Sequence, residues 1–169
     1  MQTDKRWYVL WVHTGAEREI YNKIRACPMI DDVLLPELYR WYRQGGEWEK
    51  RKALAFPSYL FIQCNMGSTL YHLLRQTDKV LGWLGKDGCW PEIVPDEQML
   101  PVLAISSGEN PASYLKDICI DRHKRRGKGI LHLVGTEQTI TFAIDPKQSG
   151  SAQVDERPVM GMDEQTEET

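Results

Sequence analysis

The sequence of 169 residues has no long hydrophobic run, no paired cysteine motif and none of the short signatures typical of catalytic sites. No apolar stretch approaches the roughly 20 residues that a membrane-spanning helix needs, and no signal core follows the basic residues near the N-terminus. We therefore expect a cytoplasmic protein with no membrane partner. With 41% hydrophobic and 27% charged residues, the composition is that of a soluble globular protein.

Cysteine and histidine are too scattered to predict a metal site. Cys27, Cys64, Cys89 and Cys119 include no C-x-x-C pair, which favours buried free thiols over zinc ligands or disulfides. The histidines lack cysteines or carboxylates at ligand spacing, and no G-x-S-x-G, P-loop or H-E-x-x-H motif is present. We therefore expect no metal, no cofactor and no enzymatic activity.

Acidic charge is concentrated at one end of the chain. The net charge is −3, but residues 1–105 are neutral, residues 106–150 carry +2 and residues 151–169 carry −5. The low apolar content after Asp145 predicts a disordered acidic tail over residues 146–169. Because the total charge is negative, any contact with nucleic acid must come from a local basic surface.

Hydrophobic periodicity predicts an α+β fold, in which helices cover an antiparallel sheet. Helices are expected over residues 15–26, from Ser68 onward and from Pro95 onward, the last of them short or kinked by Pro101. Thr14 and Glu17 fit a capping box before the first helix. Strands are expected at residues 7–12, 33–43, 48–55, 59–63 and 80–85, and, after a linker, near 118–120, 130–134 and 139–144.

The stretch Lys50–Gln63 joins three cations to a run of aromatic and aliphatic residues. Pro57 cannot donate to a sheet, so it marks the start of a strand and places Phe56 and Tyr59 near that point. Two interpretations stay open for these rings. They are core residues, or they form an exposed apolar patch beside a cationic strip, which suits a protein–nucleic-acid assembly.

Cations and aromatic residues also alternate along the hairpin that precedes this stretch. Such alternation suits contacts with phosphates and bases. The alternative is a solvated hairpin whose lysines and arginines protect an exposed edge.

Four segments in order resemble the N-terminal domain of NusG-type transcription factors: Trp7-Tyr8-Val9, Thr14-Gly15-x-Glu17, Phe56-Pro57-x-Tyr59-Leu60-Phe61-Ile62 and Val80-Leu81-Gly82-Trp83-Leu84-Gly85. The resemblance covers residues 6–105, and no single motif carries it. Within that superfamily the chain looks most like the specialised LoaP-type paralogues, because residues 120–126 resemble the middle of that group's C-terminal KOW domain.

The resemblance implies an N-terminal (NGN) domain over residues 1–105 that binds the clamp helices of the largest RNA polymerase subunit. Such factors bridge the cleft over the DNA, modulate pausing and, in specialised paralogues, support antitermination. The residues carried over to the polymerase-binding patch are Trp11, Phe56, Pro57, Tyr59 and Phe61.

The resemblance also implies contacts with non-template DNA or nascent RNA. Arg75, Gln76 and Thr77 match the position where some members touch the non-template strand, although Asn is common where this chain has Gln76. The hairpin would reach upstream DNA or RNA through Arg40, Arg43, Lys50, Arg51 and Lys52. A basic turn near the C-terminus adds Arg122, Lys124, Arg125 and Arg126.

Two departures from the family pattern affect these expectations. Ser58 stands where Gly is frequent. The linker over residues 106–117 leads almost directly into the β segment 118–145, so the start of a KOW barrel is missing, and we expect two or three strands, poorly ordered or docked on the N-terminal domain. The usual KOW partners, a small-subunit ribosomal protein and the Rho termination factor, are therefore left open. A leader-RNA-binding module stays the alternative to a polymerase-binding factor.

Overall fold

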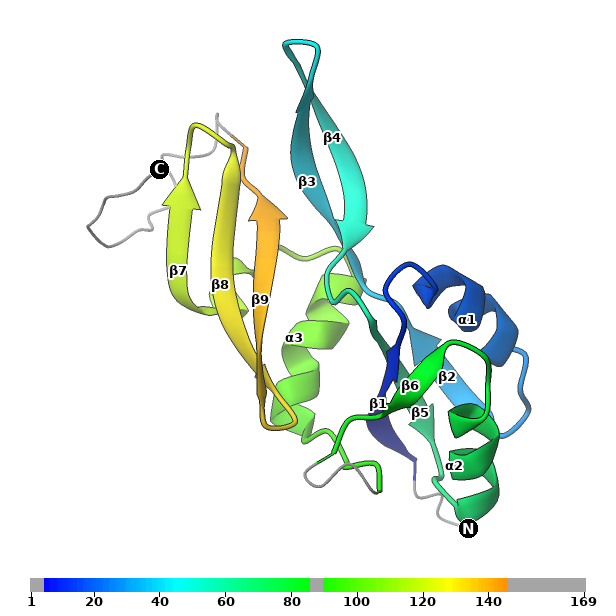
Figure 1. Cartoon of the computed structure of the whole chain (residues 1–169). Coiled ribbons are helices and arrows are strands. Elements are labelled where there is room, and N and C mark those ends of the chain that lie inside the picture. Colours follow the sequence, from blue (N-terminus) through cyan, green and yellow to red (C-terminus); the bar gives the residue numbers. More distant parts are fainter. Residues whose placement is uncertain (1–4, 86–89, 146–169) are drawn as a thin grey trace.

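The computed structural model of the chain describes residues 5–85 and 90–145 (Figure 1). Its N-terminal part is built on an antiparallel sheet of four strands in the order β2-β5-β1-β6. These strands are β1 (Arg6–Val12), β2 (Ile30–Leu34), β5 (Tyr59–Cys64) and β6 (Val80–Trp83). The two central strands are the apolar segments of the sequence, as expected for strands that are covered on both faces.

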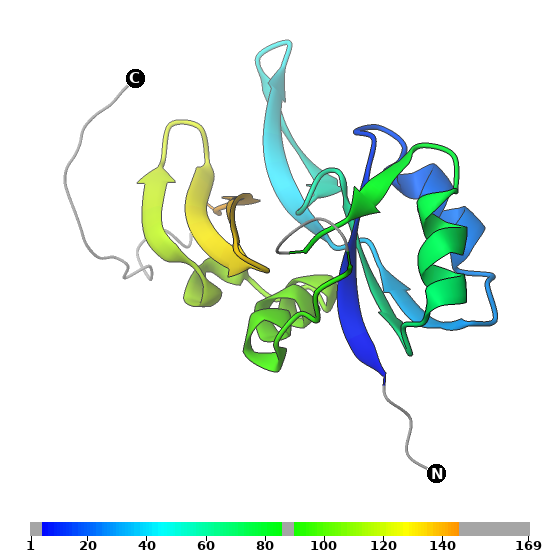
Figure 2. The ribbon, with the colours of Figure 1, turned by 60° about the horizontal axis from the view of Figure 1, so that its bottom comes forward.

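Two helices, α1 (Glu17–Ile24) and α2 (Ser68–Arg75), lie on one face of this sheet (Figures 1 and 2). Residues at even positions of β1 and β5, such as Leu10 and Leu60, point toward these helices because side chains alternate across a strand. They share a buried cluster with Ile20 of α1 and Leu74 of α2. The helical spacing of the apolar residues in α1 and α2 therefore places them on the sheet, as predicted.

The opposite face of the sheet is covered by helix α3 (Asp96–Ser106) and by a second sheet in the order β7-β8-β9. A 3-10 turn, η1 (Pro111–Tyr114), leads into β7 (Lys116–Asp121), β8 (Arg126–Leu133) and β9 (Thr136–Ala143). Helix α3 lies between the two sheets in both views (Figures 1 and 2). One buried cluster contains Val9 of β1, Val102 of α3 and Phe142 of β9, so both sheets share a core.

Two glycines of β8 allow side chains to pack directly against the strand in the C-terminal sheet. A Cβ atom added at Gly129 would lie 2.6 Å from Cβ of Leu115, and one at Gly127 would lie 2.5 Å from the Phe142 ring. Glycine at these two positions of β8 therefore lets neighbouring side chains pack directly on the strand.

A hairpin of β3 (Glu37–Gln44) and β4 (Glu47–Leu54) extends beyond the four-stranded sheet, and β3 contacts β9 of the C-terminal sheet (Figure 1). Its two-residue loop consists of Gly45 and Gly46, both with positive φ, which is the backbone that tight hairpin turns need. The register pairs Trp41 with Lys50 and Arg43 with Trp48.

The predicted α+β class is confirmed, with a β-rich segment after the N-terminal domain, and this segment is docked on the N-terminal part through the shared core. One detail was wrong: the predicted strand over residues 33–43 is split, because β2 and β3 belong to different sheets. Helix α3 continues through Pro101 for 11 residues, so the alternative of a short helix does not hold, and burial of Met99, Val102 and Ile105 offsets the lost hydrogen bond. The predicted acidic tail lies outside the described residues. No helix in the described ranges is both long and apolar enough to cross a membrane.

The predicted capping box forms only on the side of Glu17, which reaches back to a local backbone N–H and also makes a longer-range contact. Thr14 does not cap α1; its Oγ1 lies 2.5 Å from Oγ of Ser58. The buried carboxylate of Glu17 accepts hydrogen bonds from the backbone N–H of Gly15 and of Ser58, each at 2.8 Å. Ser58 has φ of 77°, a backbone region that glycine adopts more easily, so Glu17 holds a strained turn before β5 in place.

The described cysteines differ in exposure. Cys64 is fully buried, Cys27 is partly buried and Cys119 is exposed on β7, so the expectation of buried thiols was wrong for Cys119. Burial raises the pKa of the Cys64 thiol to about 12, with smaller contributions from Asp31 and Cys27. Cys89 lies outside the described residues.

Replacing Glu17 by Gln removes the charge and one of its two acceptor oxygens. We expect Glu17→Gln to lower the free energy of unfolding by about 1–3 kcal/mol, because a buried N–H is left without a partner. Urea unfolding followed by circular dichroism measures this change. The matched control is Glu19→Gln, which removes an exposed ion pair with Lys79 and should have little effect. Equal stability of Glu17→Gln and the parent protein would contradict this role.

The raised pKa of Cys64 predicts slow alkylation. At pH 8 iodoacetamide should modify Cys119 readily and leave Cys64 intact in the folded protein, because the thiolate is the reacting form and Cys64 is both protonated and buried. Peptide mass spectrometry assigns the modified positions, and modification in denaturant serves as the positive control. Alkylation of Cys64 at the same rate as Cys119 would show that the core is open there.

Candidate functional site

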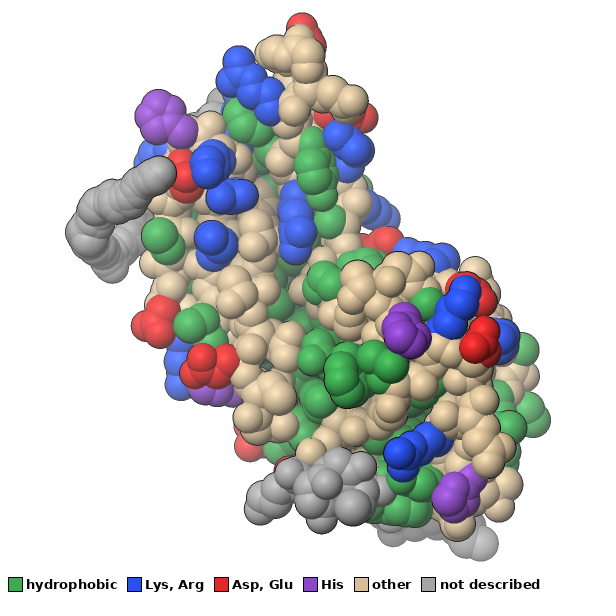
Figure 3. All heavy atoms as spheres, viewed as in Figure 1, with side chains coloured by type: hydrophobic (Ala, Val, Ile, Leu, Met, Phe, Trp, Pro, Cys, Tyr) green, Lys and Arg blue, Asp and Glu red, His purple; other side chains and the backbone are tan. Residues whose placement is uncertain are grey.

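One corner of the N-terminal sheet leaves apolar side chains exposed. Trp11 is directly opposite Tyr59 in the antiparallel pairing of β1 and β5, so the two side chains lie on the same face. Trp11 is 44% exposed, Tyr59 is partly exposed and Pro57 is exposed. Leu81 of β6 is 40% exposed and precedes Gly82, which pairs with Trp11 from the other neighbouring strand. Apolar side chains gather over β1 and β6 in Figure 3.

Phe56 and Phe61 do not belong to this exposed corner. They are 1% and 0% exposed, and their rings meet edge to face at a centroid distance of 5.1 Å. Both lie in the cluster formed with α3 and the C-terminal sheet. Of the two interpretations left open, the core interpretation therefore holds for Phe56 and Phe61, and their assignment to an accessible patch was wrong, because segments far along the chain cover them. The predicted patch is reduced to Trp11, Pro57 and Tyr59.

The hairpin carries its rings and cations on a defined face. Side chains alternate along a strand, so odd positions of β3 share a face with the even positions of β4 that are opposite them. We call the part of this face beyond Glu37 and Leu54 the ring face; it consists of Tyr39, Trp41, Arg43, Trp48, Lys50 and Lys52. Lys50 Nζ lies 5.5 Å from the ring centres of both Tyr39 and Trp41, and Arg43 lies 5.5 Å from Trp48.

The other predicted hairpin cations point to the opposite side. Arg51 lies over the ring of Tyr42 at 4.4 Å and beside Glu49. Arg40 donates from Nε to the carbonyl of Thr141 in β9 at 3.1 Å. Arg40 therefore ties the hairpin to the C-terminal sheet.

The cations of the basic turn between β7 and β8 also differ in their surroundings. Arg122 and Lys124 are exposed. Arg125 has positive φ and lies over two hairpin rings, 5.0 Å from Trp41 and 4.9 Å from Trp48. Arg126 begins β8, and its buried Nε has no hydrogen-bond partner among the described residues. The structure thus brings Arg125 to the hairpin although 77 residues separate it from Trp48.

The third predicted group lies elsewhere. Arg75, Gln76 and Thr77 are at the end of α2, on the opposite side of the main sheet from the C-terminal sheet (Figure 1). Arg75 donates to the hydroxyl of Tyr71 at 2.9 Å, and Thr77 donates to the carbonyl of Leu73. The predicted nucleic-acid residues therefore form two separate surfaces.

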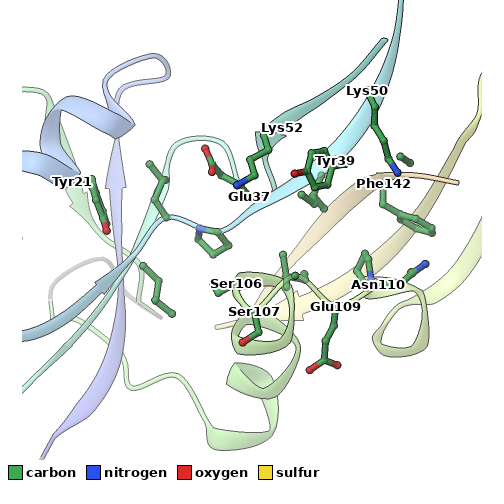
Figure 4. Close-up of a pocket in the computed structure, with 18 of the residues that line it drawn as sticks. Tyr21, Glu37, Tyr39, Lys50, Lys52, Ser106, Ser107, Glu109, Asn110 and Phe142 are labelled. Carbon is green, nitrogen blue, oxygen red and sulfur yellow. The ribbon is translucent and has the colours of Figure 1, made fainter. Parts of the chain in front are cut away.

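A cavity of about 600 Å³ lies between the hairpin, the end of α3 and β9. Figure 4 shows Tyr39, Lys50 and Lys52 along the hairpin side, with Phe142 of β9 below Lys50 and Ser107 on the other side. Its lining also includes Glu37 and Glu109, and the Glu37 carboxylate is paired with Arg18. In the described ranges, no group of three His, Cys, Asp or Glu side chains could hold a metal ion.

Sequence reasoning named the cations but did not sort them by face. The signal was present, because alternation along a hairpin assigns odd positions of β3 and even positions of β4 to one side once the two-residue turn fixes the register. The position of Arg125 carried no such signal, since it depends on how the C-terminal sheet docks.

The fold places the chain among α+β proteins with a second β-rich unit. A solved structure titled "Domain interaction in Thermotoga maritima NusG" is similar, with a TM-score of 0.56 and 20% sequence identity over 83% of this chain and 94% of that chain. The family model described as "Transcription termination factor nusG" matches residues 5–103. The chain belongs to the NusG family.

Curated relatives agree with this assignment. The transcription termination/antitermination protein NusG of Buchnera aphidicola is 30% identical over 102 residues, covering 56% of each chain. The protein of the same name from Pseudomonas aeruginosa is 26% identical over 116 residues, covering 63% of this chain and 66% of its own. The chain thus spans less than two thirds of the length of these relatives.

Truncating Phe56 tests whether its ring is core or surface. We expect Phe56→Ala to lower the free energy of unfolding by about 3–5 kcal/mol, because it leaves a cavity in the shared core. Pro57→Ala, at the exposed neighbouring position, is the control and should change stability far less. Urea unfolding measures both. Unaltered stability of Phe56→Ala would place the ring at the surface after all.

Proposed function

We propose that this chain is a transcription elongation and antitermination factor that binds RNA polymerase through the exposed corner of Trp11, Pro57 and Tyr59. Membership of the NusG family supports the general role, because the relatives carry the name transcription termination/antitermination protein. The observation that carries the binding site is the 44% exposed ring of Trp11 directly opposite the partly exposed ring of Tyr59 at one end of the sheet. Exposed aromatic residues of this kind often anchor protein interfaces.

In the proposed mechanism the protein acts by binding to the polymerase and catalyses no reaction. The apolar corner docks on the clamp helices of the largest polymerase subunit, and the rigid sheet bridges the cleft over the DNA. The exposed end of α2, with Arg75, Gln76 and Thr77, would then contact the non-template strand. Binding of this kind modulates pausing by favouring one arrangement of the enzyme over others.

The proposed division of the chain is an N-terminal domain over residues 1–105, a linker over 106–117 and a KOW-like segment over 118–145. The end of α3 at Ser106 and the start of β7 at Lys116 support these boundaries. Within the family we propose a specialised paralogue of the LoaP type, which the resemblance of residues 120–126 supports.

A second candidate function is binding of leader RNA, with polymerase contact secondary. The ring face of the hairpin and the basic turn next to it favour this candidate. Its test is a gel-shift series with leader RNA at increasing salt, since phosphate contacts weaken steeply with salt. Absence of RNA binding at low salt would remove it.

Truncating the exposed rings tests the polymerase site. We expect Trp11→Ala and Tyr59→Ala each to weaken binding to purified core polymerase at least tenfold, which corresponds to about 1.4 kcal/mol per variant. Biolayer interferometry measures the affinities, and pause lifetimes on a stalled elongation scaffold measure the effect on transcription.

The matched control is Leu100→Ala, which truncates an apolar residue on α3 that is 60% exposed and outside the proposed site. It should leave polymerase affinity unchanged. If Trp11→Ala and Tyr59→Ala bind as tightly as the parent protein while retaining their circular dichroism, the docking corner is wrong.

A further inference from the structure

We propose that the ring face of the hairpin, Arg125 and the adjoining cavity form one groove that binds a single strand of nucleic acid. This inference deepens the second candidate function and rests on it. It adds three aromatic residues, Tyr39, Trp41 and Trp48, and it makes the site depend on both parts of the protein.

The rings and cations are arranged as a ladder. Going along the hairpin, Lys52 lies 5.9 Å from Tyr39, Lys50 lies 5.5 Å from both Tyr39 and Trp41, and Arg125 lies 5.0 Å from Trp41 and 4.9 Å from Trp48. Arg43 follows at 5.5 Å from Trp48. Successive rings on one strand face offer stacking surfaces for bases, and the cations between them can neutralise phosphates.

The cations of this ladder are not neutralised by carboxylates in the part of the protein that the structure describes. Among residues 5–85 and 90–145, the four cations Arg43, Lys50, Lys52 and Arg125 form no ion pair with a carboxylate within 4.0 Å. Figure 3 shows lysine and arginine side chains gathered over the hairpin and over β7 and β8, with apolar side chains between them. Local positive charge therefore attracts an anionic polymer despite the negative total charge.

The cavity adjoins the Tyr39 end of the ladder, between the hairpin, α3 and β9. Tyr39, Lys50 and Lys52 line its hairpin side, and Tyr39 is 48% exposed (Figure 4). Glu37 lies beside Lys52 in Figure 4 and is paired with Arg18, whereas Glu109 lies across the cavity and accepts a hydrogen bond from Tyr114. Because the Glu109 carboxylate repels phosphate, the sugar–phosphate backbone would follow the lysines on the opposite side, with a base directed at the Tyr39 ring.

A single strand suits this groove better than a duplex. In a double helix the base faces are stacked on each other and cannot reach protein rings, so only the phosphates would be recognised. Proteins that bind single strands combine a cationic groove with exposed rings, and stacking tolerates any base. RNA and DNA strands share this chemistry, so both are tested.

The groove is complete only when the C-terminal sheet is docked. Arg125 comes from the β7–β8 turn, and its carbonyl accepts a hydrogen bond from Ile144 at 3.1 Å. Trp41 donates from Nε1 to the carbonyl of Ile144 at 2.9 Å, and Arg40 bonds to Thr141. A strand bound to Trp41, Trp48 and Arg125 together would stabilise this docked arrangement.

The experiment measures fluorescence anisotropy of labelled 12-nucleotide oligouridine and oligothymidine with the full chain. We expect Arg125→Gln and Trp48→Ala each to weaken binding at least tenfold, and Trp48→Phe, which keeps a ring, to stay within about threefold. Lys23→Gln, an exposed cation on α1, is the charge-matched control and should stay within about twofold. If four phosphates are neutralised, affinity should fall about 50-fold between 50 and 200 mM salt.

Tighter binding of either oligonucleotide would support the groove and identify RNA or DNA as its ligand. Parental affinity in both Arg125→Gln and Trp48→Ala, a preference for duplex over single strand, or no binding at 50 mM salt would overturn it. Equal binding of a leader-RNA hairpin by the parent and both variants would overturn the groove and leave the second candidate function standing. Polymerase affinity is measured without an oligonucleotide, so the two proposals fail independently.

Discussion

The far face of the four-stranded sheet is apolar along most of its length, and water must be excluded from it for the fold to be stable. No single element is wide enough to do this. Helix α3 covers the centre and the C-terminal sheet adds Leu131, Leu133, Ile140 and Phe142 to the same core. The two parts of the chain therefore depend on one buried surface, and the open corner at Trp11 is what this surface leaves uncovered.

A short three-stranded sheet is stable in this setting because it does not need a core of its own. Sheets of so few strands bury little apolar area alone. Here Leu115 packs against Gly129 and Phe142 packs against Gly127, so the inner side of the sheet is close to α3 and to the N-terminal sheet. Docking supplies the burial that a complete barrel would otherwise supply.

Local patterns in the sequence predicted local structure well. The apolar spacing of Ile20 and Ile24 predicted α1, and the Gly45-Gly46 turn predicted the hairpin. Long-range contacts carried no such pattern. The local sequence around Phe56 and Phe61 would look the same whether their rings faced solvent or α3. In the same way, the position of Glu17 fits a local helix cap as well as a hydrogen bond from Ser58. The site residues that were misplaced are those whose environment is set by segments more than 30 residues away.

Arg40 donates a hydrogen bond to the carbonyl of Thr141 in β9, and Trp41 donates one to the carbonyl of Ile144, just after the strand ends. An unpaired strand edge normally offers a template on which another chain can add a strand and start aggregation. At the other edge of the same sheet, β7 has a register shift and a positive φ at Asp117, which interrupt regular strand addition. An open sheet can thus resist templated self-association without closing into a barrel.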